Sequence, residues 1–249
     1  MPVTTEQRGA TLIVTLDREA KRNAINAEMA GAIDGALNDF EDDDDLRVAV
    51  LTGGPNVFCA GTDIAEGSGP LTERGGEYGI IRRRSPKPII AAVEGFAFGG
   101  GFEIALACDL IVAATTATFG LPEVRRGLVA TSAGLFRAPR NLPLNVAREL
   151  LLTGEPMSAE RAERIGVVNL LTEPGGSVDA AVDLARSIEL GAPTSIRATL
   201  AALDALYEEG DARGWDATDA AKETIMASED RAEGIAAFFE RRPPEWPGR

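Results

Sequence analysis

The chain has 249 residues, of which 45% are hydrophobic and 5% aromatic, so it is long enough for one large domain with a mainly aliphatic core. Its 25 Lys and Arg against 39 Asp and Glu give a formal net charge of −14, which disfavours extended contact with nucleic acid or anionic membranes. It contains no histidine, which excludes Ser-His-Asp and Cys-His nucleophile systems and imidazole-bound zinc. Acid–base chemistry near neutral pH must therefore fall to carboxylates.

The cysteine content and the amino terminus indicate a compartment. Cys59 and Cys108 are too few for a four-cysteine metal site and are typical of reduced, buried residues in a cytosolic protein. Residues 1–8 have neither a basic flank nor an apolar run, so we expect no signal peptide. No stretch approaches the ~18 apolar residues of a membrane span. We expect a cytoplasmic protein with no metal and no contact with nucleic acid or membrane.

Local patterns in the first fifth of the chain predict a strand and then a helix. Residues 11–16 alternate and are β-branched, which predicts a strand. Asn26 can cap a following helix, whose apolar positions keep the spacing of one helical face. These positions are Met29, Ile33, Ala36, Leu37 and Phe40. The helix is expected to end in the acidic run of residues 41–45, which opposes the helix dipole and is best interpreted as a solvated corner.

Three short apolar runs without alternation predict strands that are buried on both faces, as in layered α/β folds. They span residues 48–52, 89–93 and 110–114. Residues 64–85 are rich in glycine and predict a mobile loop that faces the substrate. Between the second and third of these runs, a helix is expected to begin at residues 99–101, three glycines, and to carry Glu103 in its first turn.

Further capping signals predict short helices and a last strand. Asn145 and Ser158 look like helix N-caps, with Gly154 and Gly166 as the corresponding C-terminal stops. Residues 167–171 then predict a strand. After this strand the β signals end.

The carboxyl-terminal part carries almost only helical patterns, from about residue 179 to 240. A helix is expected to start at Ser228. One amphipathic face combines Ala181, Val182, Leu184, Ala185 and Ile188. The change from mixed to helical patterns predicts a boundary near residue 190, with a core of residues 1–190 and a helical oligomerisation region of residues 191–249.

A pair of glutamates, Glu103 and Glu123, is the most informative feature of the chain. Glu103 follows three glycines whose backbone N–H groups are approachable at a helix start, and Glu123 follows Gly-Leu-Pro. Each motif is weak alone, because glycines mark helix starts and an early glutamate is simply a good first-turn residue. The turn at residues 58–64, Phe-Cys-Ala-Gly-Thr-Asp-Ile, is a second segment with a small residue and a glycine after a buried strand. Two such turns can supply two convergent N–H donors, as an enolate-like intermediate requires.

In this order and spacing the motifs resemble the crotonase superfamily, which comprises enoyl-CoA hydratases and isomerases. The segments that carry the resemblance are residues 16–25, 58–64, 88–109, 119–123, 152–154 and 228–242. The resemblance implies an α/β fold, a spiral of ββα units with two roughly perpendicular sheets, followed by helices that form a homotrimer or a dimer of trimers. The face of Ile235, Phe238 and Phe239 then belongs to an interface rather than to the core.

The resemblance also implies catalytic roles. The backbone N–H groups of Ala60 and Gly100 match the family's oxyanion hole, which holds the thioester oxygen of an acyl-CoA. Glu103 and Glu123 match the two glutamates that, in hydratases, hold one water, activate it for attack at C3 and deliver a proton to C2. Two carboxylates around one water push each other's pKa values apart, as a base and an acid require.

Substrate binding follows from the same resemblance. The CoA moiety would lie along Lys21, Arg22 and Ala24 and along the backbone near Asp63 and Ile64. CoA is part of the thioester substrate, so no separate cofactor is expected. Residues 82–84, three arginines, face either CoA or solvent and receive no role.

One departure keeps the reaction open. Hydratases of the family have a Pro-Gly-x-Gly-Gly stretch after the second glutamate, and this chain has Thr131 within Ala-Thr-Ser-Ala-Gly instead. The N–H of Thr131 can still donate, but its side chain takes space beside the site. The leading hypothesis is hydration of a trans-2-enoyl-CoA. The alternatives are double-bond isomerisation, hydrolysis or decarboxylation of another CoA thioester, and a non-catalytic acyl-CoA binder.

Overall fold

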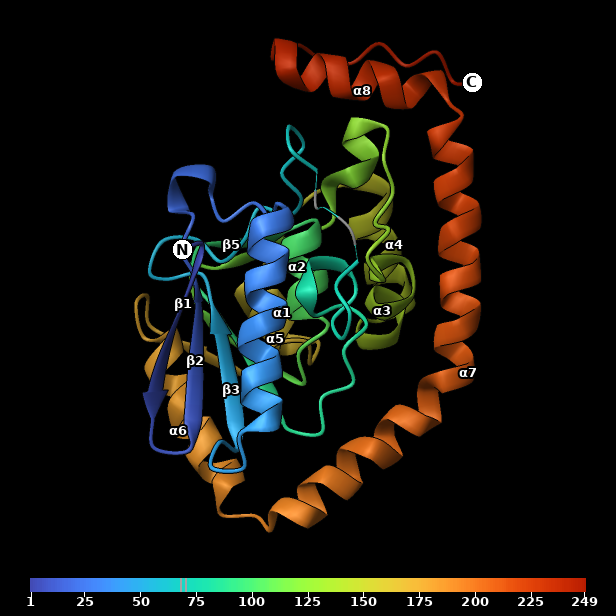
Figure 1. The fold of residues 1–249 in the computed structure, drawn as a ribbon. Coiled ribbons are helices and arrows are strands. Elements are labelled where there is room, and N and C mark those ends of the chain that lie inside the picture. Colours follow the sequence, from blue (N-terminus) through green and yellow to red (C-terminus); the bar gives the residue numbers. More distant parts are fainter. Residues whose placement is uncertain (68, 70) are drawn as a thin grey trace.

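The computed structural model describes residues 1–67, 69 and 71–249. Within this part of the chain, the larger of two β-sheets has six strands (Figure 1). In spatial order the strands are β1 (Val3–Arg8), β2 (Thr11–Leu16), β3 (Val48–Thr52), β4 (Ile89–Val93), β6 (Leu110–Ala114) and β9 (Leu170–Thr172). β1 pairs with β2 in antiparallel orientation, and the other neighbours are parallel. The four predicted apolar and β-branched runs are β2, β3, β4 and β6, so these predictions are confirmed.

A smaller sheet continues the chain after two of these strands. Its members are β5 (Phe96–Phe98), β7 (Thr118–Gly120) and β8 (Met157–Ser158). β5 follows β4 and precedes a helix, and β7 follows β6. This repetition of two strands and a helix agrees with the predicted ββα spiral.

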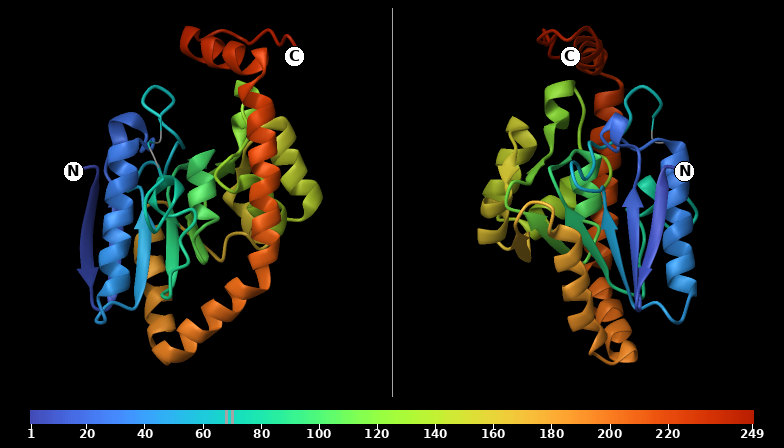
Figure 2. Two further views of the ribbon diagram at one scale, coloured as in Figure 1. Left: turned by 45° about the vertical axis from the view of Figure 1, so that its right-hand side comes forward. Right: turned by 90° about the vertical axis from the view of Figure 1, so that its left-hand side faces the viewer.

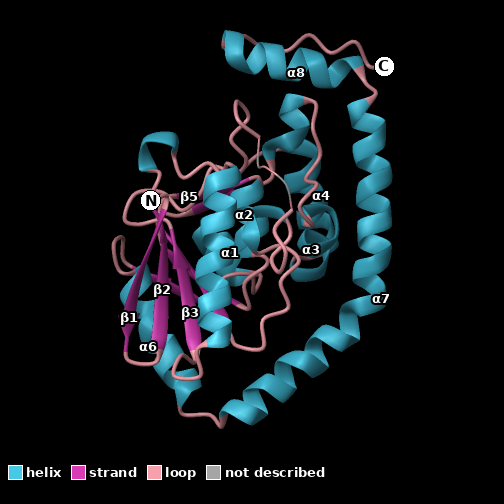
Figure 3. Ribbon diagram, viewed as in Figure 1, coloured by secondary structure: helices cyan, strands magenta, loops and turns pink. Residues whose placement is uncertain are grey.

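Helices surround both sheets (Figure 3). They are α1 (Ala27–Asp42), α2 (Gly100–Ala105), α3 (Gly134–Asn141), α4 (Leu144–Thr153), α5 (Ala159–Arg164), α6 (Ser177–Glu189), α7 (Pro193–Met226) and α8 (Glu229–Glu240). Three short 3-10 segments are η1 (Glu19–Lys21), η2 (Glu77–Gly79) and η3 (Pro122–Arg126). The predicted helix at the three glycines is α2, which begins at Gly100, carries Glu103 in its first turn and ends at Ala105.

The large sheet is buried on both faces. One face packs against α1, and the core that they share includes the strand residues Leu12, Val14, Leu16 and Leu51. The other face packs against α6, with Ile13, Val50, Ile90, Ala181 and Ala185 in a separate apolar cluster. Burial on both sides explains the unbroken apolar runs. It also means that β2, expected to alternate, is almost wholly buried.

The predicted caps are confirmed except one. Asn26 accepts a hydrogen bond from the Met29 N–H at 3.0 Å and caps α1. Ser158 caps α5 by accepting from the Arg161 N–H. Asn145 is not a cap, because Pro143 supplies the extended residue from which α4 starts and Asn145 lies inside the helix. A proline before the first helical residue fixes the start without a side-chain cap.

Two strands differ from their predictions at the ends of the chain. β1 was not expected, because four of its residues are exposed and polar and only pairing with β2 makes it a strand. The predicted strand at residues 167–171 is β9, which starts later, at Leu170. The preceding Asn169 instead uses its side chain to accept from the Ile111 N–H at 2.8 Å.

The glycine-rich segment of residues 64–85 is held down over its second half, contrary to a wholly mobile loop. Asp34 of α1 accepts a hydrogen bond from the Gly75 N–H at 2.8 Å and forms an ion pair with Arg83 at 2.6 Å. Arg83 is buried and also pairs with Glu41 at 2.9 Å. Glu41, the first residue of the run predicted to be a solvated corner, therefore helps to anchor the glycine-rich segment through Arg83.

Residues 68 and 70 of the predicted mobile loop lie outside the described residues. On either side of them the segment lines a cavity described below.

The carboxyl-terminal helices pass along one side of the molecule (Figures 1 and 2). α7 spans 34 residues, of which Thr218 alone is buried, and α8 lies against η3. The predicted boundary near residue 190 falls between α6 and α7 and stays a prediction. Within the described ranges, no helix combines the length and apolarity needed to cross a membrane.

Candidate active site

A cavity of about 710 Å³ opens beside the first turn of α2. It lies between the turn after β3, the glycine-rich segment, η3, the segment between η3 and α3, and the carboxyl-terminal helices. The predicted site residues that line it are Ala60, Ile64, Gly100, Glu103, Glu123 and Thr131. Segments far apart in sequence thus meet in a space large enough for a small-molecule ligand.

Glu103 is held rigidly at the bottom of this cavity. Its side chain is almost fully buried, at 2% exposure, and Oε1 accepts hydrogen bonds from the N–H groups of Ser132 and Gly134, both at 2.8 Å. Burial raises the pKa of Glu103, and the nearby charge of Glu123 raises it further. The two N–H donors and the more distant Arg137 only partly offset these effects.

Glu123 reaches the same cavity from η3, which Pro122 starts. Burial is the largest cause that raises the pKa of Glu123. Its Oε2 is buried and lacks a hydrogen-bond partner among the described residues. Two buried carboxylates that repel each other ionise one at a time, so the pair holds a proton well above the ordinary titration range of glutamate. An unsatisfied buried oxygen is also a natural place for a bound water.

The N–H donors differ in part from those predicted. The Ala60 N–H donates to the Arg22 carbonyl at 3.0 Å, so it is not the free donor that the resemblance implied. Two positions further on, the Thr62 N–H donates to no acceptor within the described residues. The N–H of Gly100 also has no acceptor there, as expected at the first residue of a helix.

The two unpaired donors belong to turns that touch. A β-carbon placed on Gly61 would lie 2.9 Å from the Gly100 nitrogen, so only glycine fits at this point. The neighbouring Asp63 N–H donates to the Ile25 carbonyl at 2.9 Å, which directs the Thr62 N–H away from that side. Thr62 and Gly100 both line the cavity. An oxygen bound there would meet donors from both turns.

Comparison with known proteins agrees with this geometry. Residues 6–249 match the model of the enoyl-CoA hydratase/isomerase family. The chain belongs to this family. A carnitinyl-CoA dehydratase of Salmonella arizonae is 42% identical to it over 253 aligned residues, which cover 97% of each chain.

Solved structures of related proteins have the same fold as this chain. A carnitinyl-CoA hydratase from Mycobacterium avium superposes with a TM-score of 0.93 at 39% identity, over 100% of this chain and 99% of the other. An enoyl-CoA hydratase from Mycobacterium tuberculosis H37Rv has a TM-score of 0.78 at 44% identity, with the same coverage. The predicted crotonase-like α/β fold is therefore confirmed.

Four predicted residues of this family member do not line the cavity. Asp63 is buried and pairs with Arg18 at 2.7 Å, and its other oxygen accepts from the Ala65 N–H. It thus stabilises the turn rather than facing a ligand. Lys21, Arg22 and Ala24 lie outside the cavity wall. The charge of Arg22 lowers the pKa of Arg126, after the larger effect of burial. The Arg22 carbonyl accepts from the N–H of Ala60, which lines the cavity, so the backbone of Arg22 lies next to the cavity wall.

Several lining residues had no local sequence signal. Arg126 of η3, Lys222 of α7 and Arg231 of α8 gather at this cavity in a chain whose net charge is −14. Tyr78 and Thr62 also line it, from the two segments, residues 64–85 and 58–64, that the sequence predicts to face the site. Only the docking of α7 and α8 beside η3 brings the cations together, so no spacing rule within one segment could have revealed them.

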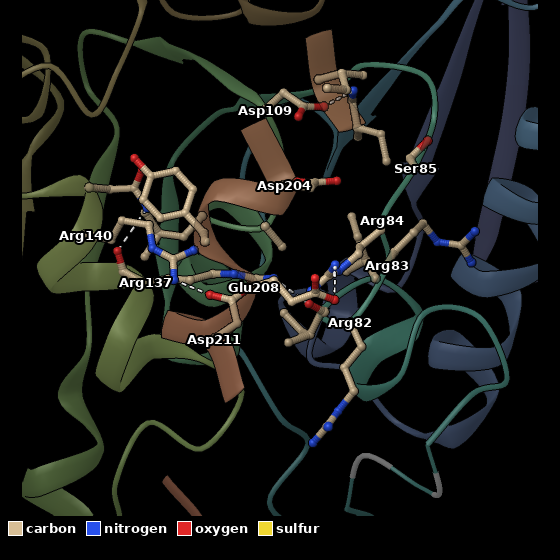
Figure 4. A pocket seen from close by; sticks show the side chains of 18 of the residues that line it. Arg82, Arg83, Arg84, Ser85, Asp109, Arg137, Arg140, Asp204, Glu208 and Asp211 are labelled. Atoms are coloured by element: carbon tan, nitrogen blue, oxygen red, sulfur yellow. Dashed lines mark hydrogen bonds and ion pairs between the residues drawn. The ribbon is translucent and has the colours of Figure 1, made fainter. Parts of the chain in front are cut away.

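A second cavity, of about 470 Å³, lies between α7 and the core (Figure 4). Neither Glu103 nor Glu123 lines it, and two ion pairs cross it, Arg140 with Asp211 and Arg84 with Glu208. The remaining arginines of the 82–84 cluster are also engaged, Arg82 with Glu77 and Arg83 with α1. Arg83 is thus a buried anchor of the fold, Arg82 also lines the cavity of the glutamates, and Arg84 forms an exposed ion pair.

Proposed function

We propose that the protein adds water across the C2–C3 double bond of a trans-2-enoyl-CoA and catalyses the reverse dehydration of a 3-hydroxyacyl-CoA. The observation that carries the proposal is the buried pair of Glu103 and Glu123, with raised pKa values, beside two unpaired N–H donors. The relatives named carnitinyl-CoA dehydratase, carnitinyl-CoA hydratase and enoyl-CoA hydratase support the same reaction type.

The pair would work as one base and one acid. The ionised carboxylate takes a proton from a water held between Glu103 and Glu123, and the water oxygen bonds to C3. The electron pair of the double bond moves toward the thioester, whose oxygen becomes negative. The protonated carboxyl then gives its proton to C2, which restores the thioester. One carboxylate has gained a proton and the other has lost one, so the pair carries the same number of protons after the reaction as before it.

The N–H groups of Thr62 and Gly100 would hold the developing negative charge. Backbone donors that are already in place need no rearrangement as charge appears on the thioester oxygen. The loss of one such donor typically costs ~3 kcal/mol of barrier. In this proposal Thr62 takes the role first assigned to Ala60, because the Ala60 N–H is already bonded.

The cations at the cavity mouth would bind the phosphates of CoA. Arg126, Lys222 and Arg231 offer charge-assisted hydrogen bonds to phosphate oxygens, with Arg22 nearby. CoA enters as part of the substrate, so the reaction needs no separate cofactor.

A carnitinyl thioester is a second candidate substrate. Several relatives are named carnitinyl-CoA dehydratase or hydratase, and the carboxylate of Asp219 lines the cavity, opposite in charge to a trimethylammonium group. The acyl group would be tested directly by measuring turnover of carnitinyl-CoA beside simple 3-hydroxyacyl-CoA substrates of increasing length.

The test of the reaction uses glutamine variants of both carboxylates. Glu103→Gln and Glu123→Gln should each slow the loss of enoyl-thioester absorbance with crotonyl-CoA by about 10²–10⁴-fold, the contribution of a positioned acid or base. Glu163→Gln, at an exposed position of α5, is the matched control and should keep full activity. The product mass should show the addition of one water.

The outcomes that would contradict hydration are equally specific. A product of unchanged mass would indicate isomerisation, and release of free CoA or loss of CO₂ would indicate hydrolysis or decarboxylation. Tight binding of acyl-CoA without turnover of any of these thioesters would indicate a non-catalytic binder.

We also propose a homotrimer or a dimer of trimers. The support is α7, since a 34-residue helix with one buried residue is not stable in isolation from partners, and the exposed apolar side chains of α7 and α8 lack a cover among the described residues.

A further inference from the structure

The side chain of Tyr78 enters the cavity from the glycine-rich segment and has no role in the mechanism above. It is 5% exposed, and its hydroxyl oxygen lies 2.7 Å from Oγ1 of Thr62. A hydrogen bond therefore joins the two side chains. Thr62 carries one of the two unpaired N–H donors, so Tyr78 contacts one half of the donor pair.

The same hydroxyl also lies close to Gly100, which carries the other unpaired N–H donor. A β-carbon placed on Gly100 would lie 2.6 Å from the Tyr78 hydroxyl oxygen, closer than any real contact of this kind. The tyrosine thus occupies the space that a side chain at Gly100 would need. The hydroxyl thus bonds to Thr62 and lies beside the start of α2.

The backbone of Tyr78 is held in an uncommon conformation. Its φ is 56°, in the left-handed region that non-glycine residues seldom adopt. Such strain persists only where the surroundings impose it, and it gathers at functional sites. Here the surroundings are identifiable on both sides of the residue.

Buried polar contacts clamp the segment that carries Tyr78. Before it, the Gly75 N–H donates to Asp34 at 2.8 Å; after it, Arg83 pairs with Asp34 and Glu41. Arg82 also lies over the ring of Trp215, 3.8 Å from its centre. These contacts hold the segment in place, with the Tyr78 hydroxyl beside Gly100.

We propose that Tyr78 is a positioning residue of the oxyanion hole, whose hydroxyl holds the Thr62 turn against the start of α2 so that both N–H donors converge on one thioester oxygen. The inference rests on the proposed function, since it assigns Tyr78 to the hole that the reaction would use. It differs from a packing role, because a packing role needs the ring and not the hydroxyl.

The hydroxyl is a stable hydrogen-bonding group at this place. Burial raises the pKa of Tyr78, and the charges of Glu103 and Glu123 raise it further. The phenol therefore keeps its proton across the range in which the glutamates titrate, and the bridge to Thr62 stays intact.

Removal of the hydroxyl tests the proposal. Tyr78→Phe keeps the ring and should lower kcat about tenfold, the worth of one hydrogen bond, while KM changes by less than about threefold. Thr62→Val removes the partner hydroxyl and should give a similar loss, and Thr62→Ser, which restores a hydroxyl, should recover most of it. The double variant should lose no more than either single one, because both remove the same bond.

The matched control is Tyr207→Phe, which removes the hydroxyl of a half-exposed tyrosine on α7 away from the cavity of the glutamates. It should leave kcat and KM unchanged. Thermal unfolding of all variants shows whether a loss of rate comes from a loss of folding. A rate loss that Thr62→Ser does not recover, or additive losses in the double variant, would overturn the positioning role.

A spectroscopic readout separates this inference from the proposed reaction. 4-Dimethylaminocinnamoyl-CoA absorbs at longer wavelength when its thioester carbonyl is polarised, whether or not water is added. Bound to the unmodified protein it should shift to the red, and Tyr78→Phe should reduce that shift. If the protein polarises this probe but hydrates no enoyl-CoA, the proposed reaction fails and the role of Tyr78 stands. An equal shift in both proteins would overturn the inference.

Discussion

In the proposed mechanism, the buried Glu103 serves catalysis at the expense of stability. The chain has no histidine, so an acid–base pair near neutral pH depends on glutamates whose pKa values are raised. The same burial that raises the pKa makes the ionised form unfavourable in the folded protein. The site residue is therefore expected to destabilise the fold once it is charged.

This expectation gives a prediction for stability against pH. In the unfolded chain Glu103 titrates near the ordinary value of ~4.3, whereas the folded protein holds its proton to higher pH. Above ~4.3 the folded state binds more protons, so the free energy of unfolding falls as pH rises through the folded pKa. Glu103→Gln removes this fall and should stabilise the protein by at least ~1 kcal/mol near pH 9, and by less near pH 5.

Urea unfolding at the two pH values measures the effect. Glu163→Gln, exposed on α5, should show no such difference between them. A Glu103→Gln variant that is equally or less stable than the unmodified protein at both pH values would contradict the assignment of a raised pKa.

Among the helices, α1 does more than cover the sheet. Its apolar face packs on the sheet as the spacing predicts, but Asp34 on the same helix holds the segment that carries Tyr78. The helix thus couples the stability of the core to the geometry of the cavity. The contact could not be read from the helical pattern, because a lone aspartate on a helix is usually solvated.

Substitution of Asp34 should affect both the stability of the core and the geometry of the cavity. Asp34→Ala leaves the buried Arg83 with Glu41 as its remaining carboxylate partner and should lower the free energy of unfolding by ~3 kcal/mol, as for a broken buried ion pair. Activity at a temperature where the variant is folded should also fall. The control is Asp39→Ala, an exposed position of the same helix, which should change neither. A stability loss no larger than that of the control would refute the anchoring role.

At the scale of the whole molecule, our proposal is that α7 and α8 determine the oligomeric state. The exposed apolar side chains of α7 include Leu203 at 49% and Leu206 at 75% exposure, three residues apart on one face. Such a face is costly in water unless another surface covers it. The predicted interface residues Phe238 and Phe239 of α8 are also exposed in the single chain.

Charge on this face should therefore reduce the size of the assembly. Combined Leu203→Asp and Leu206→Asp substitutions are expected to convert a trimer or larger species into smaller ones in sedimentation velocity. Leu144→Asp, at an exposed position of α4, is the control and should keep the assembly of the unmodified protein. A monomeric unmodified protein, or an unchanged assembly in the double variant, would contradict the proposal.

Local periodicity, caps and ordered motifs were enough to predict the fold class, most strands and helices, and the meeting of Glu103 and Glu123 in one cavity. They could not predict which backbone donors are free. The Ala60 N–H is bonded to Arg22 while that of Thr62 is not, which depends on how two distant turns cross. Packing also brought Tyr78 and the cations of η3, α7 and α8 to the same space. Hydrogen bonds and contacts between distant segments are settled only when the chain has packed.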